Sequence, residues 1–253
     1  MDRAEAIAHH RRALMSFVRL VGTGDDNSRV LELDGVTASV VSQIPDRSIV
    51  NSVAYTDGRS LEAALDNLAA AYEDAGVRAW TVWVPEDDRD VADLLESAGH
   101  RLDAEPRAMV AELANLPDPE PGALDWSAGA DPRDVGRIND LAYGWEEGTF
   151  IRAMGRFGAI DALRLYTARV EGEPACVLGT HDNGTDCELY FVATLADHRG
   201  KGLARRLTHR AMLEARDRGL TVSSLQATKM GYPVYERLGY EPICTLQMWE
   251  RRR

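Results

Sequence analysis

Hydrophobic residues in the second half of the chain recur at two spacings, one typical of amphipathic helices and one typical of half-buried strands. The predicted helices cover residues 132–143, 150–157, 202–218 and 233–238. The predicted strands cover residues 163–170, 175–180, 187–195, 221–227 and 243–249. Turn residues separate the first three strands, so we expect them to be consecutive and antiparallel. This order indicates an α/β fold with a mixed, mostly antiparallel sheet flanked by helices.

The first half of the chain follows, less regularly, the later part of the same order. Helices are expected over residues 3–20, 61–75 and 91–98. Strands are expected over residues 30–33, 37–42, 49–54, 79–84 and 108–113. A local match supports the repeat, because Val91–His100 aligns without gaps on Gly231–Tyr240 and brings Gly99 and Gly239 into register. We therefore expect an internal duplication.

A proline-rich segment separates the two halves. Residues 114–122 (ANLPDPEPG) contain three prolines and a glycine with almost no apolar side chains, a composition typical of linkers between packed units. We therefore predict a first domain over residues 1–113, a linker over 114–122 and a second domain over 123–253.

Composition and charge narrow the range of functions. The 253 residues are 45% hydrophobic and 28% charged, which fits a globular protein able to bury a core. The net charge of −12 argues against duplex DNA or an anionic membrane as the main partner, because both attract basic surfaces. Neither a membrane-spanning apolar stretch nor a signal-peptide core is present, so we expect a cytoplasmic protein. Three cysteines form no CxxC pair and are expected to be buried free thiols: Cys176, Cys187 and Cys244.

The strongest chemical signal is the segment Glu188–Leu207 (ELYFVATLADHRGKGLARRL), in which a predicted strand leads through a glycine-containing turn into a helix. Glycine lets backbone N–H groups approach a ligand closely, and the free N–H groups at a helix start favour an anion such as a pyrophosphate. The spacing differs from that of Walker loops and of G-x-G-x-x-G loops. We expect an anion-binding loop, and the alternative is a tight turn without a ligand.

Two ordered motifs in this half resemble those of the GNAT superfamily of acyl-CoA N-acyltransferases. They are R-G-x-G-x-A at residues 199–204 and P-V-Y-E-R-L-G-Y at residues 233–240, with a strand between them. The resemblance covers residues 122–253 and implies two GNAT-like domains, the first of which is degenerate. At the corresponding positions the first domain has Gly58 in place of the paired glycines and Leu95 in place of the tyrosine.

The resemblance also implies where acetyl-CoA binds as a cosubstrate, and it implies no metal. In the superfamily, the strand before the loop pairs with the pantetheine arm through its backbone, which places Val192, Ala193 and Thr194 along the cofactor. The loop and the first helical turn hold the pyrophosphate through backbone N–H groups and basic side chains. The positions concerned are Arg199, Gly200, Lys201, Gly202, Leu203, Ala204 and Arg205. The next arginines of the helix, Arg206 and Arg210, are expected to face solvent.

Candidate catalytic residues follow from the same resemblance. Tyr235 matches the tyrosine that lies beside the cofactor sulfur and protonates the leaving thiolate. The alternative is an aromatic residue that only packs in the core. A general base must also remove a proton from the acceptor ammonium group. Glu188 is the first candidate, on the strand face of Thr194 if no bulge intervenes, and Asp186 is the second. The alternative for Glu188 is a carboxylate that faces solvent at a hairpin end.

The segment Tyr143–Phe150 combines aromatic and acidic side chains. In the superfamily this region covers the acceptor pocket, so Trp145 and Glu146 are candidates for binding a cationic amine. The alternative is a solvated turn between helices. Two positions depart from the superfamily pattern, since Thr228 replaces an asparagine and Gly231 replaces an alanine.

These observations together predict an N-acetyltransferase that moves an acetyl group from acetyl-CoA to a primary amine by direct attack in a ternary complex. The expected acceptor is a small cationic molecule, with neither nucleic acid nor membrane as a partner. Two alternatives are a non-catalytic coenzyme A-binding regulatory or interaction protein and a nucleotide-binding fold with a variant phosphate loop. The pattern does not identify the acceptor, the acyl length or the oligomeric state.

Overall fold

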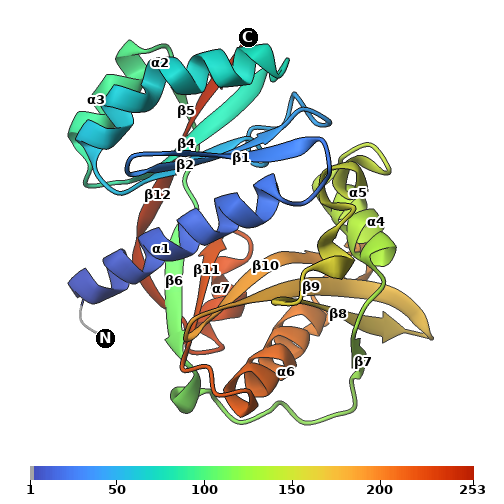
Figure 1. Cartoon of the computed structure of the whole chain (residues 1–253). Helices are drawn as coiled ribbons and strands as arrows, with labels where there is room; N and C mark the ends of the chain where they lie inside the picture. The colour runs from blue at the N-terminus through green and yellow to red at the C-terminus, as the bar shows by residue number, and fades with distance from the viewer. Residues whose placement is uncertain (1–2) are drawn as a thin grey trace. The chain divides into compact units, whose positions relative to one another are not determined.

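The computed structural model describes residues 3–253, which form two compact units (Figure 1). The first unit contains the described residues up to Ala108 together with Ile243–Arg253, and the second unit is Met109–Pro242. This division differs from the predicted one in two places. Residues 109–122, predicted as the end of the first domain and the linker, lie inside the second unit, and Ile243–Arg253 belong to the first. Within the described part of the chain, no helix is both long and apolar enough to cross a membrane.

The first unit is built on a sheet with the strand order β1-β2-β3-β4-β12, with β5 beside β12. Its strands are β1 (Ser28–Leu33), β2 (Val36–Val41), β3 (Ser52–Tyr55), β4 (Ala79–Pro85), β5 (Arg101–Ala104) and β12 (Glu241–Arg252). Its helices are α1 (Arg3–Gly22), α2 (Gly58–Asp74) and α3 (Arg89–Ser97). Only β3 and β4 pair in parallel, and the other pairs are antiparallel. The short strand β5 was not predicted, because its mostly exposed residues show no apolar alternation.

The last strand of the chain is a central strand of the first unit. β12 pairs antiparallel with β4 from Leu246 opposite Pro85 to Arg252 opposite Ala79. β4 is buried along its whole length, and buried backbone N–H and C=O groups must find hydrogen-bond partners. β12 supplies these partners on one edge of β4. The predicted strand over 243–249 is therefore confirmed, but its partner belongs to the other half of the sequence.

The second unit carries a sheet with the order β6-β11-β10-β9-β8-β7. Its strands are β6 (Arg107–Glu112), β7 (Asp125–Ala128), β8 (Leu163–Val170), β9 (Glu173–Asn183), β10 (Asp186–Thr194) and β11 (Val222–Ala227). Its α-helices are α4 (Pro132–Tyr143), α5 (Thr149–Met154), α6 (Leu203–Asp217) and α7 (Tyr232–Glu236). Short 3-10 turns are η1 (Leu113–Asn115), η2 (Phe157–Ala159) and η3 (Ala196–His198). The three predicted antiparallel strands are confirmed as β8, β9 and β10, whereas the four-residue β7 was missed.

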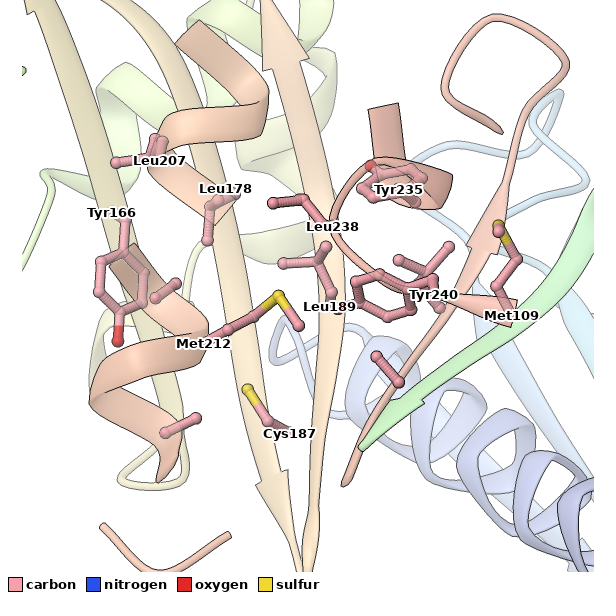
Figure 2. Close-up of a cluster of buried hydrophobic side chains, with 14 of the residues drawn as sticks. Met109, Tyr166, Leu178, Cys187, Leu189, Leu207, Met212, Tyr235, Leu238 and Tyr240 are labelled. Atoms are coloured by element: carbon pink, nitrogen blue, oxygen red, sulfur yellow. The ribbon is translucent and has the colours of Figure 1, made fainter. Parts of the chain in front are cut away.

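Figure 2 shows the hydrophobic core of the second unit, where α6 packs on the sheet. Leu207 and Met212 are fully buried on one face of the helix, as the hydrophobic spacing predicts. They belong to one cluster with Cys187 and Leu189, which alternate along β10. The three cysteines are buried free thiols, which confirms the prediction from their spacing.

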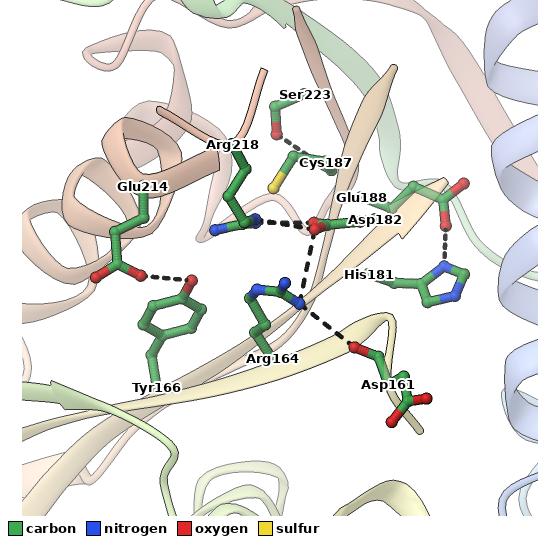
Figure 3. A network of polar contacts seen from close by, with 10 residues as sticks. All are labelled: Asp161, Arg164, Tyr166, His181, Asp182, Cys187, Glu188, Glu214, Arg218 and Ser223. Carbon is green, nitrogen blue, oxygen red and sulfur yellow. Dashed lines mark hydrogen bonds and ion pairs between the residues drawn. The ribbon is translucent and has the colours of Figure 1, made fainter. Parts of the chain in front are cut away.

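A charged network fixes α6 against the neighbouring strands (Figure 3). The Arg218 guanidinium, just beyond α6, donates to both carboxylate oxygens of Asp182 at 2.9 and 2.8 Å. Arg164 lies 3.7 Å from the same carboxylate, and the Tyr166 hydroxyl donates to Glu214 at 3.0 Å. Arg218 and Asp182 are only 23% and 21% exposed, so this bidentate pair is better shielded than a surface ion pair. The network holds the helix in position relative to β8 and β9.

The two units repeat one order of elements, as the duplication predicts. In each unit an antiparallel strand pair leads to a strand, a helix, a parallel strand and a short helix. The short helices end in the same way, with Gly99 at a φ of 87° and Gly239 at 85°. After each glycine, a backbone N–H donates back into the helix. His100 donates to the Leu95 carbonyl at 2.9 Å, and Tyr240 donates to the Tyr235 carbonyl at 3.1 Å.

Candidate active site

The candidate site lies where β10 and β11 separate. The two strands pair in parallel at three positions, the last of which is Glu188 opposite Ser224. β10 then continues to Thr194 without this partner. A strand whose neighbour diverges presents backbone N–H and C=O groups to which an extended ligand can bind. The predicted pantetheine-binding positions Val192, Ala193 and Thr194 lie on this stretch.

A β-bulge at Phe191 bends β10 at the start of this stretch. Phe191 has a φ of 55°, and the register between β10 and β9 slips by one residue there. An extra residue moves every later side chain to the opposite face of the strand. The predicted shared face of Glu188 and Thr194, which required a strand without a bulge, is therefore not formed. The Thr194 hydroxyl instead donates to the sulfur of Cys176 at 3.2 Å.

The start of α6 has the backbone of an anion-binding loop. Gly200 and Gly202 both have a φ of 74°, in the left-handed region that favours glycine. Gly202 is the N-cap residue and provides no side-chain cap, so the first N–H groups of α6 are not satisfied by the usual capping oxygen. These groups and the helix dipole can stabilise a bound pyrophosphate. Leu203 is buried in the core and contributes only its backbone here.

The corresponding helix start in the first unit is blocked by the protein itself. The N-cap of α2 is Asp57, whose carboxylate accepts from the Ser60 N–H at 3.1 Å and from the Ser60 hydroxyl at 2.9 Å. The same carboxylate also accepts from the Thr56 hydroxyl at 3.2 Å. These hydrogen bonds, led by the one from the Ser60 backbone, lower the pKa of Asp57. A negatively charged cap at this place disfavours a second anion, which is consistent with a degenerate first repeat.

Two of the three basic side chains at the loop form hydrogen bonds or an ion pair within the second unit. The Arg199 guanidinium donates to the carbonyl of Thr194 at 3.2 Å and to the carbonyl of Ala142 at 3.0 Å. Arg205 forms an ion pair with Glu120. Lys201 is exposed, and its Nζ lies 3.4 Å from Nδ1 of His198. In this arrangement Arg199 links the end of α4 to the end of β10.

The predicted solvent-facing arginine of α6 is also engaged. Arg206 donates to the carbonyl of Gly122 at 2.9 Å and to the carbonyl of Ala123. The expectation that Arg206 only faces water is therefore wrong, because residues 117–124 run alongside α6. Ala204 packs partly against the core.

Tyr235 on α7 is 8% exposed and lies in the core cluster. Its ring contacts Tyr240 edge to face, with 5.7 Å between ring centres (Figure 2). Among residues 3–253 its hydroxyl has no hydrogen-bond partner. Burial, followed by the nearby phenol of Tyr143 and thiol of Cys176, raises the pKa of Tyr235. The hydroxyl therefore stays protonated at neutral pH and can donate to a developing thiolate.

Glu188 is fully buried and does not face solvent at the hairpin end. Its carboxylate accepts from Asn183 Nδ2 at 2.9 Å and from the Tyr190 hydroxyl at 2.9 Å. His181 Nδ1 lies 3.0 Å from the same carboxylate (Figure 3). The second candidate base, Asp186, is also buried and accepts from the Ser224 hydroxyl at 2.5 Å. Sequence reasoning did not identify His181, whose place beside Glu188 follows from the pairing of β9 with β10.

The segment after α4 places aromatic rings beside β10. The Tyr143 hydroxyl donates to the carbonyl of Val192 at 3.3 Å, and the Trp145 ring lies 6.4 Å from the Tyr143 ring. Glu146 is exposed, and its backbone carbonyl accepts from the Thr149 N–H at 3.0 Å. Trp145 and Glu146 therefore remain predicted substrate-binding residues, whereas Tyr143 is the aromatic side chain that contacts the strand.

The two departures from the superfamily pattern have local explanations. A Cβ atom on Gly231 would lie 3.1 Å from Cε2 of Tyr235, so glycine lets this ring pack closely. The Thr228 hydroxyl accepts from the Gly231 N–H at 3.1 Å and thereby caps the turn before α7.

Comparison with known proteins agrees with this geometry. Residues 187–243 match the model of the acetyltransferase (GNAT) domain. A GCN5-related N-acetyltransferase from Kribbella flavida is similar in structure, with a TM-score of 0.70 and 19% identity over 95% of this chain and 94% of that one. A GCN5-related N-acetyltransferase from Sphaerobacter thermophilus has a TM-score of 0.61 and 19% identity over 86% and 76% of the two chains.

A tandem GNAT protein from the clavulanic acid biosynthesis pathway is also similar, with a TM-score of 0.59 and 13% identity over 96% of this chain and 94% of that one. No curated protein matches the sequence. The C-terminal region thus matches the GNAT acetyltransferase domain over residues 187–243, and the chain has the GNAT fold over most of its length.

Proposed function

We propose that the second unit transfers an acetyl group from acetyl-CoA to the primary amine of a small cationic molecule. The observation that carries the proposal is the separation of β10 from β11 directly before a helix start with two left-handed glycines, Gly200 and Gly202. The first feature suits an extended amide-containing arm and the second suits a pyrophosphate. Acetyl-CoA contains both groups, in that order from the reactive thioester.

The residues of the unit have distinct roles in this proposal. The backbone of Val192, Ala193 and Thr194 pairs with the pantetheine arm, and the first turn of α6 binds the pyrophosphate. Bound acetyl-CoA supplies the thioester carbon that the amine attacks. Glu188 accepts the first proton of the acceptor ammonium, directly or through water, and the neutral amine then attacks the thioester carbon. The nitrogen of the tetrahedral intermediate loses its second proton to water, while Tyr235 donates a proton to the sulfur as the carbon–sulfur bond breaks and is reprotonated from water. Attack and departure occur in one ternary complex.

The acceptor class is supported by charge and by the segment after α4. The chain has a net charge of −12, and Glu146 lies three residues after Tyr143, whose hydroxyl contacts β10. Carboxylates and aromatic ring faces both attract ammonium groups. A cationic amine of low molecular mass therefore suits the site better than a nucleic acid.

Calorimetric titration of the full chain tests the proposal, with acetyl-CoA, ATP and NAD compared in parallel. We expect one-to-one binding of acetyl-CoA alone, followed by release of free thiol when a suitable amine is added. The buried cysteines favour this assay, because burial raises the pKa of Cys176 to about 11 and that of Cys187 to about 12. Binding of ATP or NAD in place of acetyl-CoA would contradict the proposal.

A second candidate is a coenzyme A-binding regulatory or interaction protein without turnover. It is favoured by Thr228, whose hydroxyl is already used by Gly231 and cannot replace an amide contact to the cofactor. The two functions differ in one measurement. Acetyl-CoA binding with no thiol release across a broad panel of amines would favour the non-catalytic protein.

A further inference from the structure

A cavity of about 120 Å³ lies between residues 117–124 and α6, wholly within the second unit. A single water needs roughly 10–15 Å³ by this measure, so the cavity has room for a larger group. Four arginines line it: Arg205, Arg206, Arg210 and Arg237. Two carboxylates, Asp118 and Glu120, also line it. The lining is therefore more positive than negative.

The four arginines differ in what already binds them. Arg205 is paired with Glu120, and Arg206 donates to backbone carbonyls of the covering segment. Arg210 and Arg237 form no ion pair or side-chain hydrogen bond with any residue in the range 3–253. A guanidinium group favours a planar or tetrahedral oxyanion that can accept two parallel hydrogen bonds. The pocket thus offers an anion two guanidinium groups that form no ion pair among residues 3–253.

The pocket adjoins the loop to which the proposed function assigns the pyrophosphate. Arg205 lies in the first turn of α6, three residues after the N-cap Gly202, and it also lines the cavity. Arg210 lies five residues further along α6, about 7.5 Å at 1.5 Å per residue, which is within reach of the groups that follow a pyrophosphate bound at the loop. In coenzyme A these groups are the adenosine and a 3′-phosphate, which is a phosphate monoester.

We propose that this pocket binds a phosphate monoester dianion, the 3′-phosphate of coenzyme A, through Arg210 and Arg237. This inference rests on the proposed function, since it takes the pyrophosphate position as given. Glu120 acts against the phosphate, because its carboxylate occupies Arg205 and adds negative charge at the pocket. The covering segment is held independently of Glu120 by a 2.8 Å hydrogen bond between His209 Nε2 and the carbonyl of Pro117.

The test compares coenzyme A with 3′-dephospho-coenzyme A, which differ only in this phosphate, by calorimetry on the full chain. We expect the parent protein to bind coenzyme A about tenfold more tightly or better, as expected for charge-assisted hydrogen bonds. Arg210→Gln and Arg237→Gln should each reduce this preference several-fold while leaving the affinity for the dephospho compound unchanged. Arg216→Gln, on an exposed part of the same helix away from the pocket, is the matched control and should retain the preference.

Glu120→Gln gives a change in the opposite direction. Removing its charge should tighten coenzyme A binding with little effect on the dephospho compound. Inorganic phosphate distinguishes the cofactor from a free anion as the source of the phosphate. It should bind the complex with dephospho-coenzyme A but not the complex with coenzyme A.

Three outcomes separate the inference from the proposed function. Equal affinity for the two compounds in the parent protein would overturn the phosphate pocket and leave acetyl-CoA binding intact. Phosphate binding to the coenzyme A complex would assign the pocket to a free anion and overturn the 3′-phosphate assignment. Absence of binding by either compound would overturn the proposed function and this inference with it.

Discussion

Replacing Tyr235 by phenylalanine should lower the rate of catalysis and leave the stability of the protein unchanged. The hydroxyl removed has no hydrogen-bond partner within residues 3–253, and the ring that remains still packs edge to face on Tyr240. We therefore expect the free energy of unfolding to change by less than about 0.5 kcal/mol. The matched control is Tyr240→Phe, because the Tyr240 hydroxyl is hydrogen-bonded to Ser223 Oγ at 2.7 Å.

The control should lose stability and keep activity. A buried hydrogen bond contributes about 1 kcal/mol, which corresponds to a decrease in Tm of about 2–4 °C for a chain of this size. Tyr235→Phe should instead lower kcat by about 10²–10⁴, the usual contribution of a positioned proton donor. That range equals about 3–5 kcal/mol of transition-state free energy. The acetyl-CoA affinity should stay within about twofold of the parent value.

Thermal unfolding, calorimetric titration and thiol release by the same three proteins provide the readouts. We expect Tyr240→Phe to lower Tm but not kcat, and Tyr235→Phe to lower kcat but not Tm. If Tyr235→Phe retained the parent kcat, Tyr235 would be only a core aromatic residue. A large decrease in its Tm would mean that the hydroxyl has a structural partner.

Three further predictions concern the loop, the candidate base and a buried histidine. Gly200→Ala and Gly219→Ala both place a side chain in open space at a positive φ, of 74° and 92°, so each should lose about 1 kcal/mol of stability. Only Gly200→Ala should also weaken acetyl-CoA binding. Equal acetyl-CoA affinity in the two variants would refute the role of the loop in binding the pyrophosphate. Glu188→Gln should lower kcat about 10²-fold or more without changing acetyl-CoA affinity, whereas Asp186→Asn should retain turnover. Steady-state kinetics of the two variants tests this, and the reverse pattern would assign the general base to Asp186. Burial lowers the pKa of His100 to about 4 in the folded protein from an ordinary value of 6.5. The neutral ring therefore contributes at most about 3 kcal/mol to the free energy of unfolding, and this contribution is present above pH 6.5 and is lost as the pH falls toward 4. Urea unfolding at several pH values should show this loss in the parent protein and not in His100→Phe; identical pH profiles would exclude His100.

Much of the fold could be predicted because local patterns determine it. The helix over 132–143 begins at the Asp131 cap and ends at Gly144, and both signals are visible in the sequence. The strand over 163–170 has the predicted bounds, since turn residues delimit it. Tyr235 could likewise be selected from a motif that keeps its spacing.

Other features depend on partners that no local pattern identifies. The bulge at Phe191 is a backbone irregularity, and it moves Thr194 to the other strand face without a sequence signal as clear as glycine. The contact of His181 with Glu188 follows from strand register. Asp57 was not predicted as a carboxylate in the position of a phosphate, although its place before a helix is a recognisable cap signal.

The place of β12 in the first unit has a consequence for the order in which the protein is made. Synthesis on the ribosome completes residues up to Ala108 first, but the strand that pairs with β4 follows only after Met109–Pro242. At roughly 5–20 residues per second, those 134 residues delay it by roughly 7–27 seconds. During this interval the buried, apolar β4 has an unpaired edge, the kind of surface that chaperones protect and that aggregates otherwise. The N-terminal half is thus synthesised first but completed last.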